Sequence, residues 1–261
     1  TGFYNRAKFF DYVHGYATAG GTDTANLTGG TGADEFVGRP TWSKLTGQGH
    51  FNRVKGFDSV TATANNERID SARLYDSAGD DTFTASPNTA TLAGAGYSLD
   101  VHLFYSIEAE ASSGTDIAEL VDSTSNDFAV GTPTETRLYN YDFSNTAKLF
   151  DVVHAYARNG GYDTASLYDS AGHDRYFNVD DSAKMLGPDT NGVPEFYVRA
   201  KLFEAVFAFA PAGGYDRAYF GDLATAQTAL GTTVTGGTSA AFEAVFVMNS
   251  NGSYDPIGNT L

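Results

Sequence analysis

The stretch FNRVKGFDSVTATANNERIDSARLYDSAGDDTF, residues 51–83, decides the fold because versions of it recur along most of the 261-residue chain. One aspartate marks the register of the copies, at intervals of 47, 46, 47 and 53 residues: Asp23, Asp70, Asp116, Asp163 and Asp216. A second aspartate follows 11 residues later in four copies: Asp34, Asp81, Asp127 and Asp174. Tandem repeats of this length are typical of solenoids and propellers.

Within each copy, small or apolar residues alternate with variable residues, as Val60, Ala62 and Ala64 do. A period of two indicates β-strands that bury one face. The same alternation occurs at residues 13–17, 107–111, 153–157 and 206–210. Clusters of turn-forming residues such as NNERID and DSAGDD separate the segments. A short strand is therefore expected about every 11 or 12 residues.

Short strands in tandem copies predict an all-β fold: a right-handed parallel β-solenoid of about ten coils, with two coils of roughly 23 residues per repeat. A propeller with one four-stranded blade per repeat is the alternative. The small, alanine-rich inner positions favour closely stacked coils. In a solenoid of this kind, we expect Asp23, Asp70, Asp116 and Asp163 to lie in one row along the molecule.

Residues 1–220 are predicted to form the β-solenoid from five repeats of about 47 residues. Residues 221–261 are interpreted as a degenerate last coil and a C-terminal cap, because FEAVFVM at 242–248 echoes FEAVFAF at 203–209. A solenoid needs such a cap to cover the edge of its last sheet.

Composition excludes several classes of function. The net charge of −16 and the sequence pI of about 4.5 disfavour nucleic-acid binding, which needs clustered Lys and Arg in excess. The absence of cysteine excludes disulfides and thiol chemistry. No apolar run reaches the roughly 18 residues of a membrane span, so no membrane insertion is expected. Because the chain begins at Thr1, we interpret it as part of a larger parent protein that is secreted to the extracellular space or cell surface.

One segment resembles a known family. GGTGADEFV at residues 29–37 fits the nonapeptide G-G-x-G-x-D-x-U-x, and it resembles the calcium-binding repeats of RTX-type secreted proteins. That resemblance implies calcium held by Asp34 and by backbone carbonyls near Gly29, Gly30 and Gly32. The related segments at 76–84, 122–130 and 169–177 lack the first two glycines. The alternative interpretation is that the aspartates which begin these segments cap tight turns: Asp76, Asp122 and Asp169.

Short basic segments precede the alternating strands. Stacked repeats would place their members in one outward row: Lys8, Lys55, His102, Lys148 and Lys201, with Arg6, Arg53 and Arg199 beside it. On the following strand, four outward positions carry rings that can stack on sugars: His14, Tyr16, His154 and Tyr156. These residues predict a binding site for an extended, anionic extracellular polysaccharide. The alternative is that the cations offset the charge of neighbouring aspartates and that the rings only stabilise the solenoid.

The third copy differs from its neighbours at four outward positions: Asp100, His102, Glu108 and Glu110. Two carboxylates two residues apart on one strand face lie about 6–7 Å apart, which overlaps the separations used by glycoside hydrolases. With a histidine as base, this set predicts the catalytic site of a polysaccharide lyase or glycoside hydrolase. Drift of the repeat on a solvated face is the alternative.

The leading hypothesis is therefore a non-catalytic polysaccharide-binding or cell-surface module, and the lyase or hydrolase is the alternative. The sequence leaves open whether the chain is an enzyme.

Overall fold

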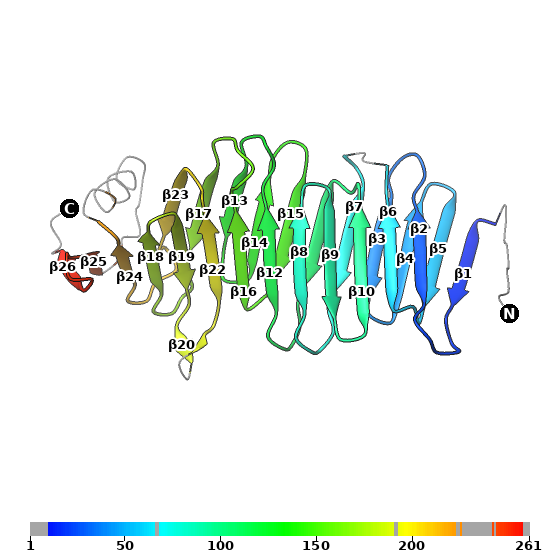
Figure 1. The fold of residues 1–261 in the computed structure, drawn as a ribbon, viewed down its shortest axis with the longest axis horizontal. Coiled ribbons are helices and arrows are strands. Elements are labelled where there is room, and N and C mark those ends of the chain that lie inside the picture. Colours follow the sequence, from blue (N-terminus) through cyan, green and yellow to red (C-terminus); the bar gives the residue numbers. More distant parts are fainter. Residues whose placement is uncertain are drawn as a thin grey trace. The chain divides into compact units, whose positions relative to one another are not determined.

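The computed structural model describes residues 10–65, 68–190, 193–222, 225, 242 and 244–257. These residues belong to two units: unit 1 comprises residues 1–115 and 142–145, and unit 2 comprises residues 116–141 and 146–261. Strands dominate both units (Figure 1). Strand β15 (Ser144–Lys148) begins in unit 1 and ends in unit 2.

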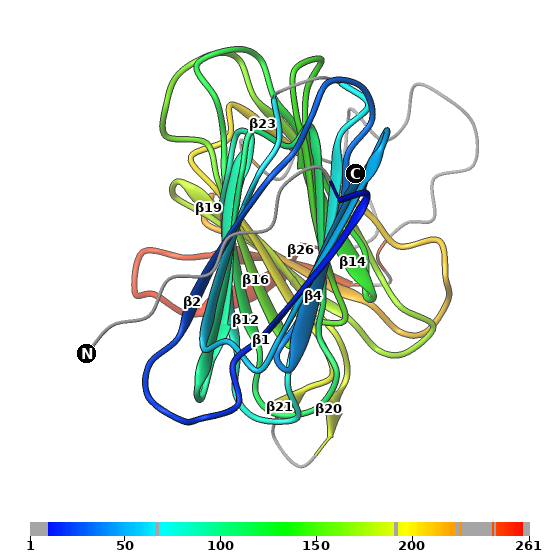
Figure 2. The same cartoon turned by 90° about the vertical axis from the view of Figure 1, so that its right-hand side faces the viewer.

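Unit 1 consists of two sheets that pack face to face. One sheet has the order β1-β5-β4-β3-β7-β11, and the other has the order β2-β6-β10-β9-β8. Figure 2 shows β2 in one layer and β1 and β4 in the other. The strands are β1 (Tyr12–Tyr16), β2 (Thr24–Thr28), β3 (Glu35–Arg39), β4 (Trp42–Gly47), β5 (His50–Lys55), β6 (Ser59–Thr63), β7 (Ser71–Tyr75), β8 (Thr82–Ser86), β9 (Thr89–Gly94), β10 (Tyr97–His102) and β11 (Ser106–Glu110).

Unit 2 has the same architecture. One sheet has the order β14-β13-β17-β23, the other has the order β12-β16-β22-β19-β18-β24-β25-β26, and β20 pairs with β21 alone. The strands are β12 (Ile117–Val121), β13 (Phe128–Gly131), β14 (Glu135–Tyr139), β16 (Val152–Tyr156), β17 (Thr164–Tyr168), β18 (Arg175–Val179), β19 (Ser182–Leu186), β20 (Asp189–Thr190), β21 (Val193–Pro194), β22 (Tyr197–Lys201), β23 (Ala205–Phe209), β24 (Arg217–Phe220), β25 (Ala244–Met248) and β26 (Tyr254–Ile257).

The core of each unit lies between its two sheets, because alternate residues of every strand point inward. In β6, Val60 and Ala62 are buried whereas Thr61 and Thr63 are partly exposed. The largest fully buried side chains of unit 1 are aromatic or long aliphatic: Phe36, Phe83, Phe104, Phe143, Leu45, Leu74, Leu92, Leu99 and Ile107. In unit 2, a buried cluster forms around Tyr176, Met185 and Phe220.

The predicted all-β parallel β-solenoid is confirmed, but with about five turns instead of about ten coils. In unit 1, parallel partners on neighbouring turns are farther apart in the sequence than 23 residues: Thr24 pairs with Ser59, and Glu35 pairs with Ser71. The turn is longer because it contains an antiparallel three-stranded meander, β3-β4-β5 or β8-β9-β10. A hairpin within one sheet has the same period of two as a crossing between sheets, so periodicity cannot distinguish them.

The meanders change where equivalent residues lie. Each of the first four repeats contributes two single strands and one meander, so that the chain enters a sheet three times per repeat. Because three is odd, equivalent positions of consecutive copies alternate between the two sheets. Asp23 precedes β2 and Asp70 precedes β7, which belong to different sheets of unit 1; in unit 2, Asp116 and Asp163 likewise precede β12 and β17. The prediction of a single row of aspartates is therefore wrong.

Successive turns pack closely at the loops. Gly161 and Gly214 have φ values of +114° and +120°, where other residues are strained. A Cβ atom at either position would also collide with a backbone carbonyl of the preceding turn, that of Ser125 or Gly172 respectively. Both the positive φ and the close carbonyl therefore require glycine two residues before the marker aspartates Asp163 and Asp216.

Of the predicted cap, residues 221–261, the structure describes residues 221, 222, 225, 242 and 244–257. There β25 pairs in parallel with β24, and β26 pairs antiparallel with β25. The described part of this segment therefore continues the sheet, and a capping function stays a prediction.

Candidate functional site

The predicted row of cations is divided between sheets. In unit 1, Lys55 ends β5 and His102 ends β10, and these strands belong to opposite sheets. In unit 2, Lys148 and Lys201 end β15 and β22, again in different sheets. Arg6 and Lys8 lie outside the described residues. The odd number of sheet visits per repeat causes this division, as it does for the aspartates.

Strand pairing nevertheless brings eight of the predicted binding residues into two groups of four. In unit 1, β1 runs parallel to β5, so His14 pairs with Arg53 and Tyr16 pairs with Lys55. In unit 2, β16 and β22 pair in the same way, and the group is His154, Tyr156, Arg199 and Lys201. Each group combines two cations and two rings on the outward face of one sheet.

The meander β3-β4-β5 extends the group in unit 1. Lys55 pairs with Trp42, and Trp42 pairs with Arg39. The Arg39 guanidinium carbon lies 3.7 Å from the centre of the Tyr75 ring on β7. Cations and aromatic rings thus alternate across four neighbouring strands. Together with flanking residues they form the cation–aromatic face of unit 1: Tyr16, Arg39, Trp42, Lys44, Arg53, Lys55 and Tyr75.

Contacts within this face hold the arginines in place. Arg39 lies 5.8 Å from the centre of the Trp42 ring, and Arg53 lies 5.3 Å from it. Such cation–π contacts contribute about 0.5–1 kcal/mol each at exposed sites. They orient the guanidinium groups over rings while their N–H groups stay able to bind an anion.

Sequence reasoning missed Arg39, Trp42, Lys44 and Tyr75. The first three lie in the hairpin β3-β4, whose turn is Pro40-Thr41. A proline-containing turn between two alternating segments was a signal for a hairpin. Once the hairpin is recognised, the outward positions follow from the period of two.

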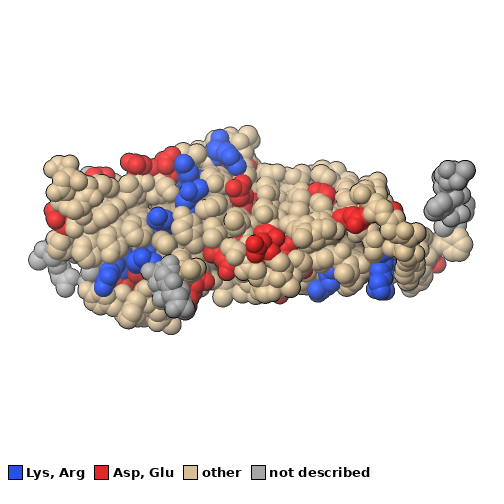
Figure 3. All heavy atoms as spheres, turned by 60° about the horizontal axis from the view of Figure 1, so that its bottom comes forward, with Lys and Arg blue, Asp and Glu red and all other residues tan. Residues whose placement is uncertain are grey.

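The cation–aromatic face of unit 2 lies on the sheet that contains β16, β22 and β19: His154, Tyr156, Lys184, Tyr197, Arg199 and Lys201. Arg199 Nη2 donates a hydrogen bond of 2.8 Å to the Tyr156 hydroxyl. Lys184 Nζ lies 5.0 Å from the centre of the Phe177 ring. Figure 3 shows several groups of Lys and Arg atoms, and also Asp and Glu atoms, on one side of the protein. Positive charge is therefore concentrated locally in an acidic protein.

Two features of the unit 2 face limit what can bind there. Burial, and secondarily the charge of Arg199, lower the pKa of His154, so its ring is neutral at pH 7. On the adjoining strands, Phe177 stacks on Tyr219 at 4.7 Å, and Tyr219 stacks on Phe246 at 4.9 Å. These three rings cover one another, so they stabilise the sheet and offer mainly their edges to a ligand.

The four predicted catalytic residues are not brought together. Asp100 and His102 lie on β10 and Glu108 and Glu110 lie on β11, in opposite sheets of unit 1. All four alternate with buried residues, so the two pairs point away from the core in opposite directions. Asp100 also accepts hydrogen bonds from Thr91 Oγ1 at 2.7 Å and Ser98 Oγ at 3.0 Å. This arrangement keeps His102 away from Glu108 and Glu110, which share the outward face of β11, so the histidine cannot serve as a base beside that carboxylate pair.

The surroundings of Asp34, the residue to which the RTX resemblance assigns calcium, bring protein groups against its carboxylate. Asp34 Oδ2 accepts the N–H of Gly30 at 3.0 Å, and Oδ1 lies 3.4 Å from Nε2 of His50. A Cβ atom at Gly29 or Gly47 would collide with the carboxylate. The glycines therefore make room for Asp34 itself. Calcium binds about six to eight oxygen ligands. At Asp34, protein N–H groups compete with an ion for the carboxylate oxygens.

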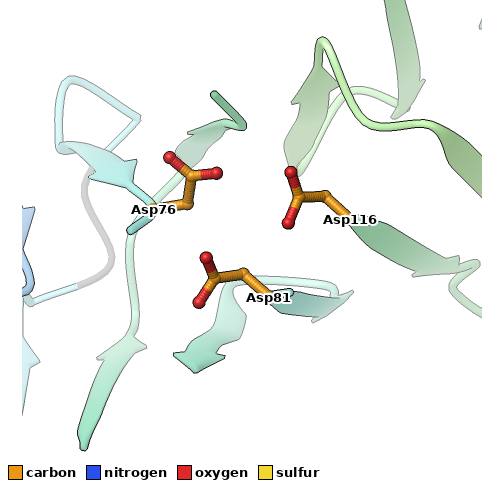
Figure 4. Close-up of side chains that lie close together, drawn as sticks. All are labelled: Asp76, Asp81 and Asp116. Carbon is orange, nitrogen blue, oxygen red and sulfur yellow. The ribbon is translucent and has the colours of Figure 1, made fainter. Parts of the chain in front are cut away.

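The other turn aspartates bond backbone groups, but the three that were interpreted as caps of tight turns bond the next turn of the solenoid, and the second aspartate of each segment makes the local bonds. Three accept both the N–H and the hydroxyl of a serine four residues earlier: Asp81 from Ser77, Asp127 from Ser123, and Asp174 from Ser170. Three others accept an N–H group from the following turn: Asp76 from Ser112, Asp122 from Asn159, and Asp169 from Ala212. Figure 4 shows Asp76 and Asp81 of unit 1; the third residue it labels, Asp116, belongs to unit 2.

Burial of these carboxylates has an electrostatic cost. In unit 2, burial and the charges of Asp216 and Asp174 raise the pKa of Asp169 to about 6. Burial, with Asp127, Asp122 and Glu204 nearby, raises the pKa of Asp163 to about 6 as well. One oxygen each of Asp169, Asp174 and Asp216 lies within 4.8 Å of the others. This group has the spacing to share a cation or a proton.

Comparisons with known proteins give no assignment: no protein-family model matches the sequence, and no curated protein and no solved structure matches it. Among the residues that the structure describes, no helix is long and apolar enough to cross a lipid bilayer. The cation–aromatic faces of the two units are therefore the basis for the proposed function.

Proposed function

We propose that this protein is a non-catalytic module that binds an extended anionic polysaccharide through its cation–aromatic faces. It acts as part of a larger protein that is secreted or displayed at the cell surface. The observation that carries this proposal is the outward series Lys55, Trp42, Arg39 and Tyr75, in which cation and ring alternate over four strands.

The spacing of this series fits a polymer. Neighbouring strands lie about 4.8 Å apart, so two residues of the same kind on alternate strands lie about 9.6 Å apart. That distance is close to the length of a disaccharide in an extended β-linked chain. A polymer with one anionic group per disaccharide can therefore contact Lys55 and Arg39 while its sugars lie against Trp42 and Tyr75.

The charge distribution supports an anionic ligand over a neutral one. The chain carries 32 acidic and 16 basic residues, yet four of the basic residues lie together on the unit 1 face: Arg39, Lys44, Arg53 and Lys55. Lys44 and Arg53 are direct cross-strand partners. Like charges directly opposite each other destabilise a sheet, and a bound anion would offset that repulsion.

Retention on gels that contain an anionic polysaccharide tests the proposal. Arg39→Ala, Trp42→Ala and Lys55→Ala should each weaken binding by about 0.5–1 kcal/mol, and more strongly at low salt. Thr63→Ala and Thr84→Ala are matched controls on the outward face of the opposite sheet of unit 1 and should bind like the parent protein.

Two results would count against a binding module. One is a parent protein that is retained by no anionic polysaccharide. The other is the appearance of reducing or unsaturated ends during incubation, since turnover would require an active site elsewhere on the chain.

A further inference from the structure

Unit 2 contains a cleft of about 430 Å³ where β18 and β24 begin, lined by His173, Asp174, Arg175, Tyr215 and Arg217. Arg175 on β18 and Arg217 on β24 are direct partners in a parallel pair. Their backbones are therefore about 4.8 Å apart, and their side chains leave the sheet in the same direction. Two arginine side chains thus leave neighbouring strands at one cleft.

Other contacts orient groups at this cleft. The Arg217 guanidinium carbon lies 5.4 Å from the centre of the Tyr215 ring. The Tyr215 backbone N–H donates a hydrogen bond of 2.7 Å to His173 Nδ1. Because Nδ1 accepts this hydrogen bond, a neutral His173 ring carries its hydrogen on Nε2, which is then the nitrogen able to donate. The cleft thus combines two arginine forks with a histidine donor.

The acid at the base of the cleft is already engaged by the protein. Asp174 is fully buried and accepts hydrogen bonds from the backbone and hydroxyl of Ser170. Burial raises its pKa against the effect of these hydrogen bonds, and the charge of Glu195 acts in the same direction as burial. The remaining charged side chains that line the cleft are positive.

We propose that this cleft binds a tetrahedral oxyanion ester, sulfate or phosphate, carried by the anionic polysaccharide; this rests on the proposed function and names the chemistry of its ligand. A carboxylate has two oxygens and is matched by a single arginine fork. An ester of sulfate or phosphate presents three terminal oxygens, enough for both forks and the His173 N–H. A bound oxyanion also offsets the repulsion between two like charges directly opposite each other.

The position of the cleft suits a ligand that is part of a polymer. Arg175 and Phe177 are consecutive outward residues of β18, and Arg217 and Tyr219 are consecutive outward residues of β24. The arginine pair therefore lies next to the stacked rings that adjoin the unit 2 face. A chain bound along that face can place one of its charged substituents in the cleft.

Unit 1 provides an internal reference. Its corresponding cleft, of about 490 Å³, has Glu35 where unit 2 has Arg175, and Ser71 where unit 2 has Arg217. Glu35 and Ser71 are partners in the same register as the two arginines. An Arg73–Glu35 ion pair of 3.9 Å crosses this cleft. The same backbone thus presents no arginine pair in unit 1.

The test compares two double variants of the full chain in low salt. Arg175→Gln with Arg217→Ser removes the pair, and Arg68→Gln with Arg137→Ser removes the same charge outside the clefts. The probes are dextran sulfate, polygalacturonate and inorganic sulfate. The first variant should bind dextran sulfate about tenfold more weakly, whereas the control should change less than about twofold. Binding of polygalacturonate should change less than about twofold in both.

The remaining outcomes separate this proposal from the proposed function. Equal binding of dextran sulfate by the parent and the cleft variant, or equal losses in both variants, overturns the oxyanion cleft while leaving the binding module intact. A parent that binds neither polymer overturns the module. If inorganic sulfate then raises the melting temperature of the parent but not of the cleft variant, the cleft is a site for free oxyanions only, and without that shift both proposals fail.

Discussion

The clefts of unit 1 and unit 2 have the same backbone register but opposite charge. In unit 1, Glu35 faces Arg73 across the cleft, while in unit 2 the equivalent strands present Arg175 and Arg217 as neighbours. Both clefts have a buried aspartate at their base, Asp34 or Asp174. The repeat thus preserves the buried groups that hold the turn together, and the outward positions differ because changing them does not disturb the core.

The strongest test of this comparison is to remove the shared aspartate. Asp34→Ala and Asp174→Ala should each lower the free energy of unfolding by about 2–3 kcal/mol, because buried donors lose their acceptors. Urea unfolding monitored by circular dichroism measures the effect. A loss below about 0.5 kcal/mol in either variant would show that the aspartate at the base is not a shared structural element.

A transplant of the arginine pair should convert one cleft into the other. Glu35→Arg with Ser71→Arg places two guanidinium groups on the unit 1 strands, in the register that Arg175 and Arg217 have in unit 2. We expect the affinity for dextran sulfate to rise about threefold to tenfold, as two new exposed charge contacts allow. Glu35→Gln with Ser71→Asn is the control for loss of the ion pair alone. If the control gains as much as the arginine variant, removal of negative charge is the cause.

The buried acids of unit 2 predict a particular pH dependence. Asp163 keeps its proton up to about pH 6 when folded, whereas its ordinary pKa is 3.8. Between these values the folded state binds more protons, so the contribution of Asp163 to stability falls as pH rises from about 4 to about 6 and is constant above. Asp163→Asn retains an acceptor for the Asp127 N–H, whose bond to Oδ1 is 2.7 Å.

Thermal unfolding from pH 4 to pH 7 checks this expectation. The Asp163→Asn protein should melt about 2–4 °C higher than the parent at pH 7, the shift that about 1 kcal/mol produces in a domain of this size. Its advantage should shrink as the pH falls to 4. A variant that is less stable than the parent at pH 7 would mean that Asp163 is needed as an anion.

Calcium provides the smallest expected effect and also distinguishes the units. Asp34 is engaged by Gly30 and lies beside His50, whereas Asp169, Asp174 and Asp216 have the spacing to share an ion. We expect any stabilisation by calcium to be lost in Asp169→Asn and retained in Asp34→Asn. At twice its Kd, the ion would add about 0.6 kcal/mol, which a melting curve with and without chelator detects. Loss in Asp34→Asn alone would restore the site that the RTX resemblance implies.

The sequence predicted many of the residues of the cation–aromatic faces, but it did not predict all of them. The pairing of His154 and Tyr156 with Arg199 and Lys201 links strands whose residues were already candidates. Trp42 and Arg39 were missed because the β3-β4 hairpin was not recognised, and Arg175 and Arg217 because they lie 42 residues apart in the chain. No local pattern indicates that two arginines so far apart become neighbours.

The sequence by itself determined the all-β class and, for the alternating segments, the strands and their inward faces, because the alternation of apolar residues is a local property of each strand. It also placed the aspartates at the turns. Only the tertiary structure decided which strands are neighbours. The length of a turn depends on the meanders, and a hairpin and a crossing between sheets have the same period in the sequence. With three sheet visits in each of the first four repeats, equivalent residues alternate between opposite sheets, so one expected row of cations became two separate cation–aromatic faces.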